Sequence, residues 1–161
     1  MQLTVFNGSP RAERSNTRLL LGWFVDGLRR VPGSDAVTFN INRRRERARQ
    51  VEAFAAASEV LLAFPLYHDA MPSIVMGFIE DLAPLRGCAG NPGLSCLVQS
   101  GFPEAHNSRF VERYLEKLAR RLGCPYRGTI VRGGVEGIQA KPAWMNRRIE
   151  QRFKELGEQF A

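Results

Sequence analysis

The chain has 161 residues, of which 44% are hydrophobic and 24% are charged, proportions that are ordinary for one globular domain spanning residues 1–161. It carries 23 Lys and Arg against 16 Asp and Glu, a formal charge of +7 that suits an anionic partner such as nucleic acid, acidic lipid or a phosphorylated cofactor. No apolar run is long enough for a transmembrane helix, and the N-terminus lacks the basic start and long apolar core of a signal peptide, so we expect a soluble protein with no membrane partner.

The N-terminal residues give a strand signal and then a helix signal. Gln2–Phe6 alternates and is rich in apolar residues, which predicts a first strand, and the turn formers of Asn7–Pro10 end it. A helix is expected to begin at Ser15 or Asn16, because both are good N-cap residues. The apolar face of this helix would contain Leu20, Phe24 and Leu28.

The central part of the chain repeats this alternation. Ala36–Ile41 predicts a second strand, and a short helix through Val51 and Phe54 is expected to follow it. Glu59–Phe64 contains an unbroken apolar run, which is typical of a strand buried on both faces of a parallel sheet. Ser73 is expected to cap the next helix. The apolar residues of that helix are Ile74, Phe78, Ile79 and Leu82.

The C-terminal third contains two further strands and two helices. Leu94–Gln99 predicts a fourth strand, and Gly128–Arg132 predicts a fifth strand at the sheet edge. Between them, apolar residues recur at helical spacing until Gly123: Val111, Tyr114, Leu115, Leu118 and Leu122. Pro142 is expected to open the last helix. The apolar stripe of that helix would be Met145, Ile149, Phe153, Leu156 and Phe160.

Five strands that alternate with helices predict an α/β fold, a doubly wound five-stranded parallel sheet with helices on both faces. For a chain of this kind the usual strand order is 2-1-3-4-5. Ligands bind such sheets beyond the carboxyl ends of the strands, near the point between the first and third strands where the order reverses. The loops after the first, third and fourth strands are therefore expected to form a ligand site.

The loop after the first strand carries groups suited to a phosphate. Residues 7–17 offer hydroxyls, an Asn amide, arginines and the free N–H groups of a helix start, where the helix dipole favours an anion. The loop is neither a Walker loop nor a Gly-x-Gly-x-x-Gly turn, so a Rossmann dinucleotide site is disfavoured. The alternative interpretation is an ordinary capped helix after a turn.

The loops after the third and fourth strands combine an aromatic residue with exposed turn backbone. Residues 64–72 contain Tyr67, and residues 99–104 contain Phe102. A planar heteroaromatic ring needs a face to stack on and N–H groups for its carbonyl oxygens. Taken singly, each aromatic residue is better explained as a hydrophobic plug under a loop. Three suitable loops at one sheet edge favour the ligand site.

Several segments together carry a resemblance that covers residues 2–135. They are Gly8-Ser9-Pro10-Arg11 leading to Ser15-Asn16-Thr17, then Pro65-Leu66-Tyr67, then Ser100-Gly101-Phe102-Pro103-Glu104. Together they resemble the NADPH-dependent FMN reductases and flavodoxin-like NAD(P)H oxidoreductases. The chain departs from relatives that carry an iron–sulfur cluster, because Arg43–Arg47, between the second and third strands, contains no cysteine.

The resemblance implies a flavodoxin-like fold, FMN as cofactor, NAD(P)H as co-substrate, and a quinone or similar small molecule as electron acceptor. It implies a phosphate site formed by Ser9, Arg11, Ser15, Asn16 and Thr17. It also implies a flavin ring bordered by Pro65, Leu66, Tyr67, Ser100, Gly101 and Phe102. His68 lies in the same loop as Tyr67 and either contacts flavin or substrate or is a surface residue. Family members are commonly homodimers or larger, so a homo-oligomer is expected.

Two further features bear on function. The basic segment Arg43–Arg49 is either a solvated stretch or an anion site, for instance for the 2′-phosphate of NADPH. Cations at a helix start oppose the helix dipole, which favours the second interpretation unless the helix starts later. The cysteines, Cys88, Cys96 and Cys124, form no Cys-x-x-Cys pair. This disfavours a metal site or a disulfide framework and fits the cytoplasm.

Two alternatives to a reductase remain open from the sequence. The first is a flavodoxin-like electron carrier or an FMN-binding protein without reductase activity, and the basic charge argues mildly against a carrier. The second is a nucleic-acid binder, which is disfavoured because no recognisable RNA or DNA module accompanies the arginine run. No catalytic side chain is predicted, because hydride passes directly between stacked nicotinamide and flavin rings.

Overall fold

The computed structural model describes residues 1–67, 69–103 and 108–161, and five parallel strands in this part of the chain form one sheet in the order β2-β1-β3-β4-β5. This confirms the predicted fold class and strand order. The strands are β1 (Gln2–Asn7), β2 (Asp35–Asn40), β3 (Glu59–Pro65), β4 (Gly93–Gln99) and β5 (Tyr126–Arg132).

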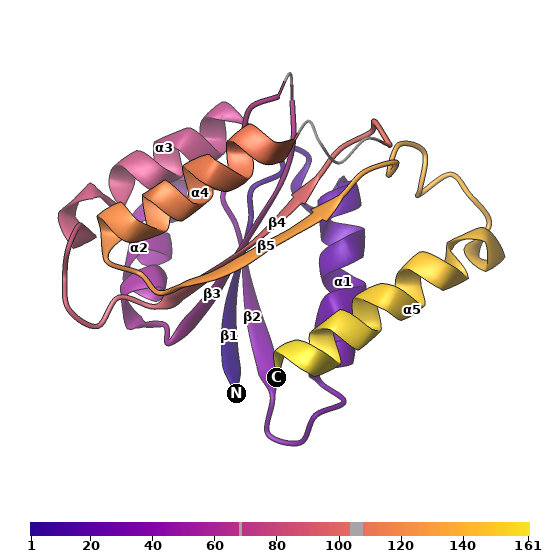
Figure 1. Cartoon of the computed structure of the whole chain (residues 1–161), viewed down its shortest axis with the longest axis horizontal. Helices are drawn as coiled ribbons and strands as arrows, with labels where there is room; N and C mark the ends of the chain where they lie inside the picture. The colour runs from indigo at the N-terminus through magenta and orange to yellow at the C-terminus, as the bar shows by residue number, and fades with distance from the viewer. Residues whose placement is uncertain (68, 104–107) are drawn as a thin grey trace.

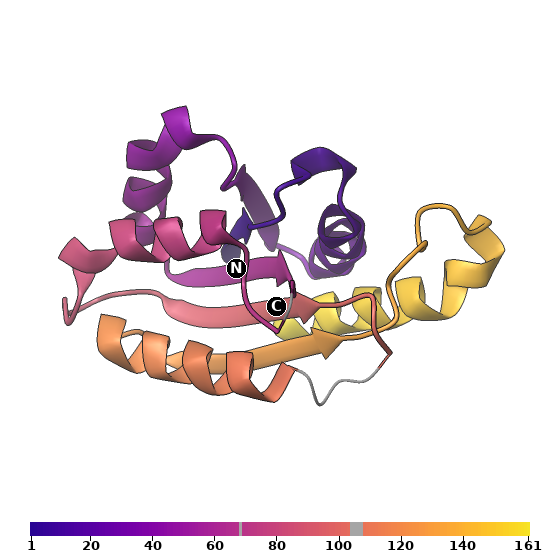
Figure 2. The same ribbon diagram turned by 90° about the horizontal axis from the view of Figure 1, so that it is seen from above.

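Helices cover both faces of the sheet (Figure 1). The α-helices are α1 (Asn16–Leu28), α2 (Arg47–Ala56), α3 (Ser73–Asp81), α4 (Arg109–Leu122) and α5 (Ala143–Phe160). Short 3₁₀ turns are η1 (Ala12–Arg14), η2 (Arg44–Glu46) and η3 (Ala83–Leu85). Figure 2 shows α1 and α5 on one face of the sheet and α2, α3 and α4 on the other.

Each face of the sheet has its own apolar core, because successive residues of a strand point to opposite faces. Phe6, with Phe54 and Phe78, belongs to the core under α2, α3 and α4. The neighbouring Val5 belongs to the core under α1 and α5. Strand β4 is buried along its whole length, as expected for a central strand of a parallel sheet.

Helices α1 and α5 cross at two glycines. A Cβ atom on Gly27 would overlap the backbone carbonyl of Lys154, and one on Gly157 would overlap the carbonyl oxygen of Phe24. The two backbones are therefore in direct contact, and this contact holds α5 against α1 rather than across the edge strand β5.

Some sequence expectations were wrong in detail. Ser73 is the first residue of α3, and Pro72 occupies the cap position. Tyr114 and Met145 were placed on buried helix faces, yet their side chains are 47% and 51% exposed. No helix in the described residues is long and apolar enough to cross a membrane.

Candidate functional site

A pocket of about 160 Å³ lies at the carboxyl ends of β1, β3 and β4, beside the start of α1. Parallel strands bring their following loops to this one edge, which is where the sequence predicted a ligand site. The residues that line the pocket are Ser9, Arg11, Ser15, Asn16, Pro65, Leu66, Tyr67, Gln99, Ser100, Gly101, Val135 and Glu136.

Most of the predicted site residues thus lie together, and two of the described ones, Thr17 and Phe102, do not line this pocket. Thr17 is fully buried, and its Oγ1 accepts a hydrogen bond from Gln99 Nε2 at 3.2 Å, so its hydroxyl is already engaged. The side chain of Phe102 is 69% exposed and stands outside the lining. His68 and Glu104 lie outside the described residues.

A buried polar network fixes the loop after β1. The side-chain amide of Asn7 donates to Asn40 Oδ1 at 3.0 Å and to the Ala12 carbonyl at 3.2 Å. Asn7 Oδ1 in turn accepts from the Ser9 backbone N–H at 3.1 Å. Asn40 Nδ2 donates to Glu13 at 2.7 Å. The end of β1, the end of β2 and the η1 turn are therefore held as one unit.

The same loop runs close to β3 and contains one unusual backbone conformation. The Gly8 N–H donates to the Ala63 carbonyl at 2.7 Å, and a Cβ atom on Gly8 would collide with Val75. Ala12 has a φ of 44°, in the left-handed region that residues with a Cβ atom rarely adopt. Such strain persists where the surroundings fix it, and it is common at ligand-binding loops.

Ser15 caps α1 and leaves N–H donors beside the pocket. Its hydroxyl accepts from the Arg18 N–H at 3.0 Å and donates to the Ala12 carbonyl at 2.6 Å. In the described part of the chain, the backbone N–H groups of Asn16 and Thr17 have no backbone acceptor, as expected for the first turn of a helix. These N–H groups and the helix dipole favour an anion at this point.

Arg11 and Glu136 are the charged residues among those that line the pocket. Arg11 lines the pocket, whereas Glu13 does not. Hydrogen bonds from Asn40 and Arg18 hold the pKa of the Glu13 carboxyl below its usual value. The Glu13 carboxylate therefore accepts hydrogen bonds from Asn40 and Arg18 and pairs with Arg18. Arg11, in contrast, forms no ion pair among the described residues.

The loops after β3 and β4 form the other side of the pocket. Tyr67 and Ala70 exchange two backbone hydrogen bonds, at 2.8 and 3.0 Å, and the Tyr67 ring is 44% exposed. The Leu66 N–H donates to the Gln99 carbonyl at 2.7 Å and joins the two loops. The N–H groups of Gly101 and Phe102 donate to no backbone carbonyl within the described residues, and Gly101 lines the pocket.

The sequence matches no family model, and no curated protein is significantly similar to it. Solved structures match along its whole length. The NAD(P)H:quinone oxidoreductase from Methanothermobacter marburgensis is 15% identical, with a TM-score of 0.76 over 100% of this chain and 99% of that chain. An FMN-dependent NADH-azoreductase from Bacillus anthracis, in complex with FMN, is 12% identical, with a TM-score of 0.72 over 100% of both chains.

The chain has the flavodoxin-like fold. A third structure of this fold, general stress protein 14 from Treponema denticola in complex with FMN, is 13% identical, with a TM-score of 0.71 over 99% of both chains. These similar structures include the kinds of protein that the sequence motifs resemble.

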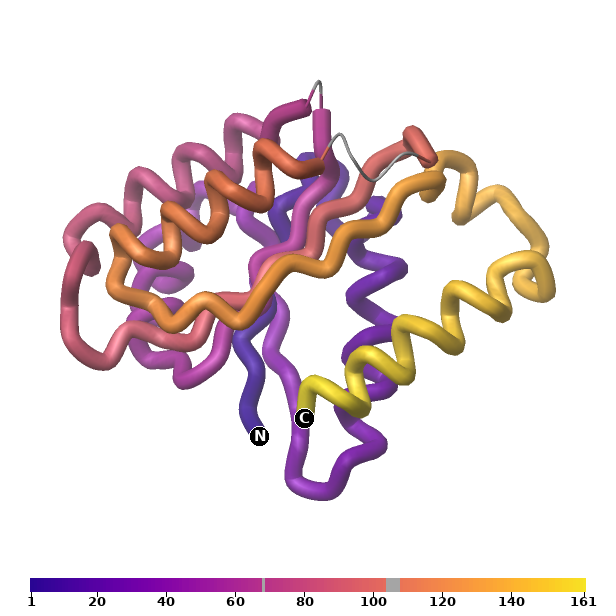
Figure 3. The backbone as a smooth tube through the Cα atoms, in the orientation of Figure 1, coloured from indigo at the N-terminus to yellow at the C-terminus, as the bar shows by residue number. Residues whose placement is uncertain are grey.

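In this flavodoxin-like chain, Gln99, Val135 and Glu136 also line the pocket, and the sequence analysis missed them. Gln99 is the polar last residue of the largely apolar strand β4, and a polar residue at that position indicates the ligand edge of the sheet. Val135 and Glu136 follow β5, whose loop reaches the same edge because the Val135 N–H donates to the Ser100 carbonyl at 3.1 Å (Figure 3). The loop after the fifth strand therefore belongs to the site as well.

The basic segment is largely accounted for by packing. Arg47 pairs with Asp81 at 3.1 Å and lies 5.5 Å above the Phe78 ring, and Arg49 lies over the Phe39 ring. Helix α2 begins at Arg47, after the η2 turn, so of this basic segment only Arg47 and Arg49 lie in the helix. A role in NADPH binding remains a prediction for the arginines before α2.

The cysteines differ sharply in reactivity. Burial raises the pKa of the Cys96 thiol to about 12 and that of Cys124 to about 11, whereas Cys88 is exposed. Because the thiolate is the reactive form, only one thiol of the native protein is expected to react rapidly with a disulfide reagent at pH 8. All three should react in denaturant. Rapid loss of a second native thiol would contradict the buried positions of Cys96 and Cys124.

Proposed function

We propose that this chain binds FMN at the carboxyl edge of its sheet and oxidises NAD(P)H, passing the electrons to a quinone or similar small acceptor. The observation that carries the proposal is the pocket at this edge, which joins a helix start with free N–H donors to two loops able to border a ring. Similarity along the whole chain to an FMN-dependent NADH-azoreductase and to an NAD(P)H:quinone oxidoreductase supports the same assignment.

The donor groups present suit a flavin mononucleotide. Arg11, the Ser9 hydroxyl and the N–H groups of Asn16 and Thr17 would hold the phosphate. The pocket is smaller than the roughly 300–1,000 Å³ of sites that enclose a drug-sized ligand. It would therefore take the phosphate end, and the ring would lie over the loops that carry Tyr67 and Gly101.

The protein's part in the reaction would be to bind and orient. When bound, the flavin supplies a ring that accepts a hydride and releases electrons to a second substrate. The Gly101 N–H would hold the carbonyl edge of that ring, and Tyr67 would shield one side. No side chain is needed as a base, because stacking brings donor and acceptor together.

Activity separates this proposal from its rival, a flavodoxin-like carrier or FMN-binding protein. The purified chain with FMN and excess quinone should oxidise NADH or NADPH continuously, and FAD should support less activity because no dinucleotide turn is present. A carrier would bind FMN without this turnover. FMN binding without NAD(P)H oxidation would therefore overturn the reductase proposal and favour the rival. A cytoplasmic homo-oligomer remains a prediction from the sequence.

Ser15 allows the cap and the anion site to be tested separately. Ser15→Ala should lower the free energy of unfolding by about 0.5–2 kcal/mol, because the Arg18 N–H loses its acceptor. Ser15→Asp keeps a cap acceptor but adds a negative charge at the pocket. The Asp variant should therefore be the more stable of the two in denaturant and the weaker in FMN titration. Tighter FMN binding by the Asp variant would place the phosphate elsewhere.

A further inference from the structure

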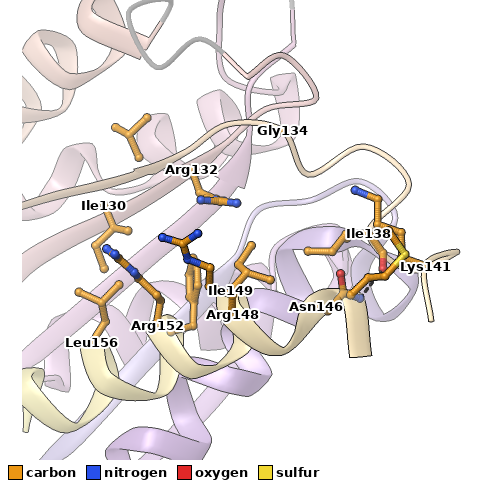
Figure 4. Close-up of a pocket in the computed structure, with 13 residues that line it drawn as sticks. Ile130, Arg132, Gly134, Ile138, Lys141, Asn146, Arg148, Ile149, Arg152 and Leu156 are labelled. Atoms are coloured by element: carbon orange, nitrogen blue, oxygen red, sulfur yellow. Dashed lines mark hydrogen bonds between the residues drawn. The ribbon is translucent and has the colours of Figure 1, made fainter. Parts of the chain in front are cut away.

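A second, larger hollow lies away from the candidate flavin site, between β5 and α5. It has a volume of about 590 Å³. It exists because α5 packs against α1 through Gly27 and Gly157 and leaves part of the edge strand uncovered. We call it the β5–α5 groove (Figure 4). Residues of β5, of the segment after β5 and of α5 line it.

The groove concentrates positive charge. Arg132, Lys141, Arg148 and Arg152 line it, and no carboxylate does. Figure 4 shows the side chains of Arg132, Arg148 and Arg152 extending into the same space from opposite walls. None of the four cations forms an ion pair within the described residues. Like charges gathered in a hollow repel one another unless an anion lies between them.

The missing carboxylates are not explained by a shortage on α5. Glu150 pairs with Lys154, and Glu158 pairs with Arg30 of the α1 end. Two of the three acidic residues of this helix thus pair with cations outside the groove lining, and Glu155 accepts a hydrogen bond from Gln151. Two of the arginines of this helix that form no ion pair with a described residue, Arg148 and Arg152, line the groove, whereas its carboxylates lie outside the lining.

The walls of the groove are apolar. Ile130 on β5 and Ile149 and Leu156 on α5 line it, and all three are only partly buried. Met145, at the start of α5, also lines the groove and is half exposed. Apolar walls around a cluster of guanidinium groups match a molecule with an apolar body and an anionic head.

We propose that the β5–α5 groove binds a small amphipathic organic anion, whose carboxylate, sulfonate or phosphate head pairs with Arg132, Arg148 and Arg152 and whose apolar body lies on Ile130, Ile149 and Leu156. The groove volume falls within the roughly 300–1,000 Å³ range of small-molecule sites. This site is separate from the flavin pocket, although both use the segment after β5: Gly134 and Ile138 line the groove, and Val135 and Glu136 line the pocket.

Calorimetric titration of the full chain with decanoate tests the proposal, with decanol and inorganic phosphate as the two half-probes. Decanoate should bind at one site, and decanol and phosphate should each bind more weakly, because each satisfies only one part of the groove. Arg148→Gln with Arg152→Gln should weaken decanoate binding by at least about tenfold, since charge-assisted hydrogen bonds are lost. The matched control is Arg147→Gln with Arg121→Gln, exposed arginines outside the groove lining that should leave the affinity unchanged.

Three results would overturn the proposal. Decanol binding as tightly as decanoate would make the groove an apolar surface only. Phosphate binding as tightly would make it a general anion site. The third result has two parts: the parent does not bind decanoate, and sedimentation velocity shows a dimer for the parent but not for the groove variant. That combination would assign the groove to a second copy of this chain. FMN titration of the same variants keeps this test separate from the flavin proposal, because none of the substituted arginines lines the flavin pocket.

Discussion

Replacing Gly27 by alanine should lower the free energy of unfolding by about 3 kcal/mol. A Cβ atom at this position would overlap the Lys154 backbone, which cannot move aside as a flexible side chain could. Overpacking typically costs about 1–3 kcal/mol and more when a backbone must shift, so we expect the upper end of that range. Because domains are stable by only about 5–15 kcal/mol, the change should be large in a denaturant titration.

Gly22 provides a matched control in the same helix. Only the Arg18 side chain, at 3.7 Å, lies near a Cβ atom built there. Gly22→Ala should therefore raise the free energy of unfolding by about 0.5–1 kcal/mol, because alanine loses less backbone freedom on folding than glycine does. Equal stabilities of the two variants would mean that α1 and α5 do not touch at Gly27.

The second large effect concerns Arg11. Arg11→Gln should weaken FMN binding by at least about tenfold, because a hydrogen bond to a charged group is worth about 1.5–3 kcal/mol. Riboflavin, which lacks the phosphate, should bind the parent and this variant with the same affinity. Fluorescence titration with both flavins measures the two effects on one preparation.

Arg14 is the control for Arg11. It is an exposed arginine in the same loop that does not line the pocket. Arg14→Gln should therefore leave FMN affinity close to that of the parent, apart from a small long-range charge effect that salt screens. If Arg11→Gln weakened riboflavin as much as FMN, the arginine would serve the loop and not the phosphate.

The fold was predictable because it depends on local patterns. The apolar run of β3 and the helical spacing of Leu20, Phe24 and Leu28 each report burial directly, and both were confirmed. The strand order followed from topology rules that hold for parallel sheets. The exposure of Tyr114 and Met145 was not predictable, because helical spacing alone does not say how much of an apolar stripe its neighbours cover.

The candidate site was predictable as a set of loops but not residue by residue. Asn16 and Thr17 are adjacent on α1, and adjacent helix positions point about 100° apart, so both side chains could not face the pocket. Asn16 lines it, and Thr17 packs inward against Gln99. Val135 and Glu136 joined the site through a hydrogen bond between the loops after β4 and β5, a contact that no local pattern encodes.

The β5–α5 groove was hidden for a related reason. From the sequence, Met145, Ile149 and Leu156 formed part of a core stripe, and nothing indicated that α5 would dock on α1 and leave β5 partly open. That docking depends on Gly27 and Gly157, each of which contacts the backbone of the other helix only in the folded chain. Long-range backbone contacts of this kind have no periodic signature.

FMN binding at the carboxyl edge of the sheet is tested most simply by titrating the purified chain with FMN. The visible absorption of the protein-bound fraction is then measured after gel filtration. We expect one FMN per chain to be retained with the protein and its spectrum to be shifted. Riboflavin should be retained more weakly, because the groups around Arg11 and the α1 start would hold the phosphate that riboflavin lacks. FMN that elutes entirely free of the protein, or riboflavin retained as well as FMN, would contradict this expectation.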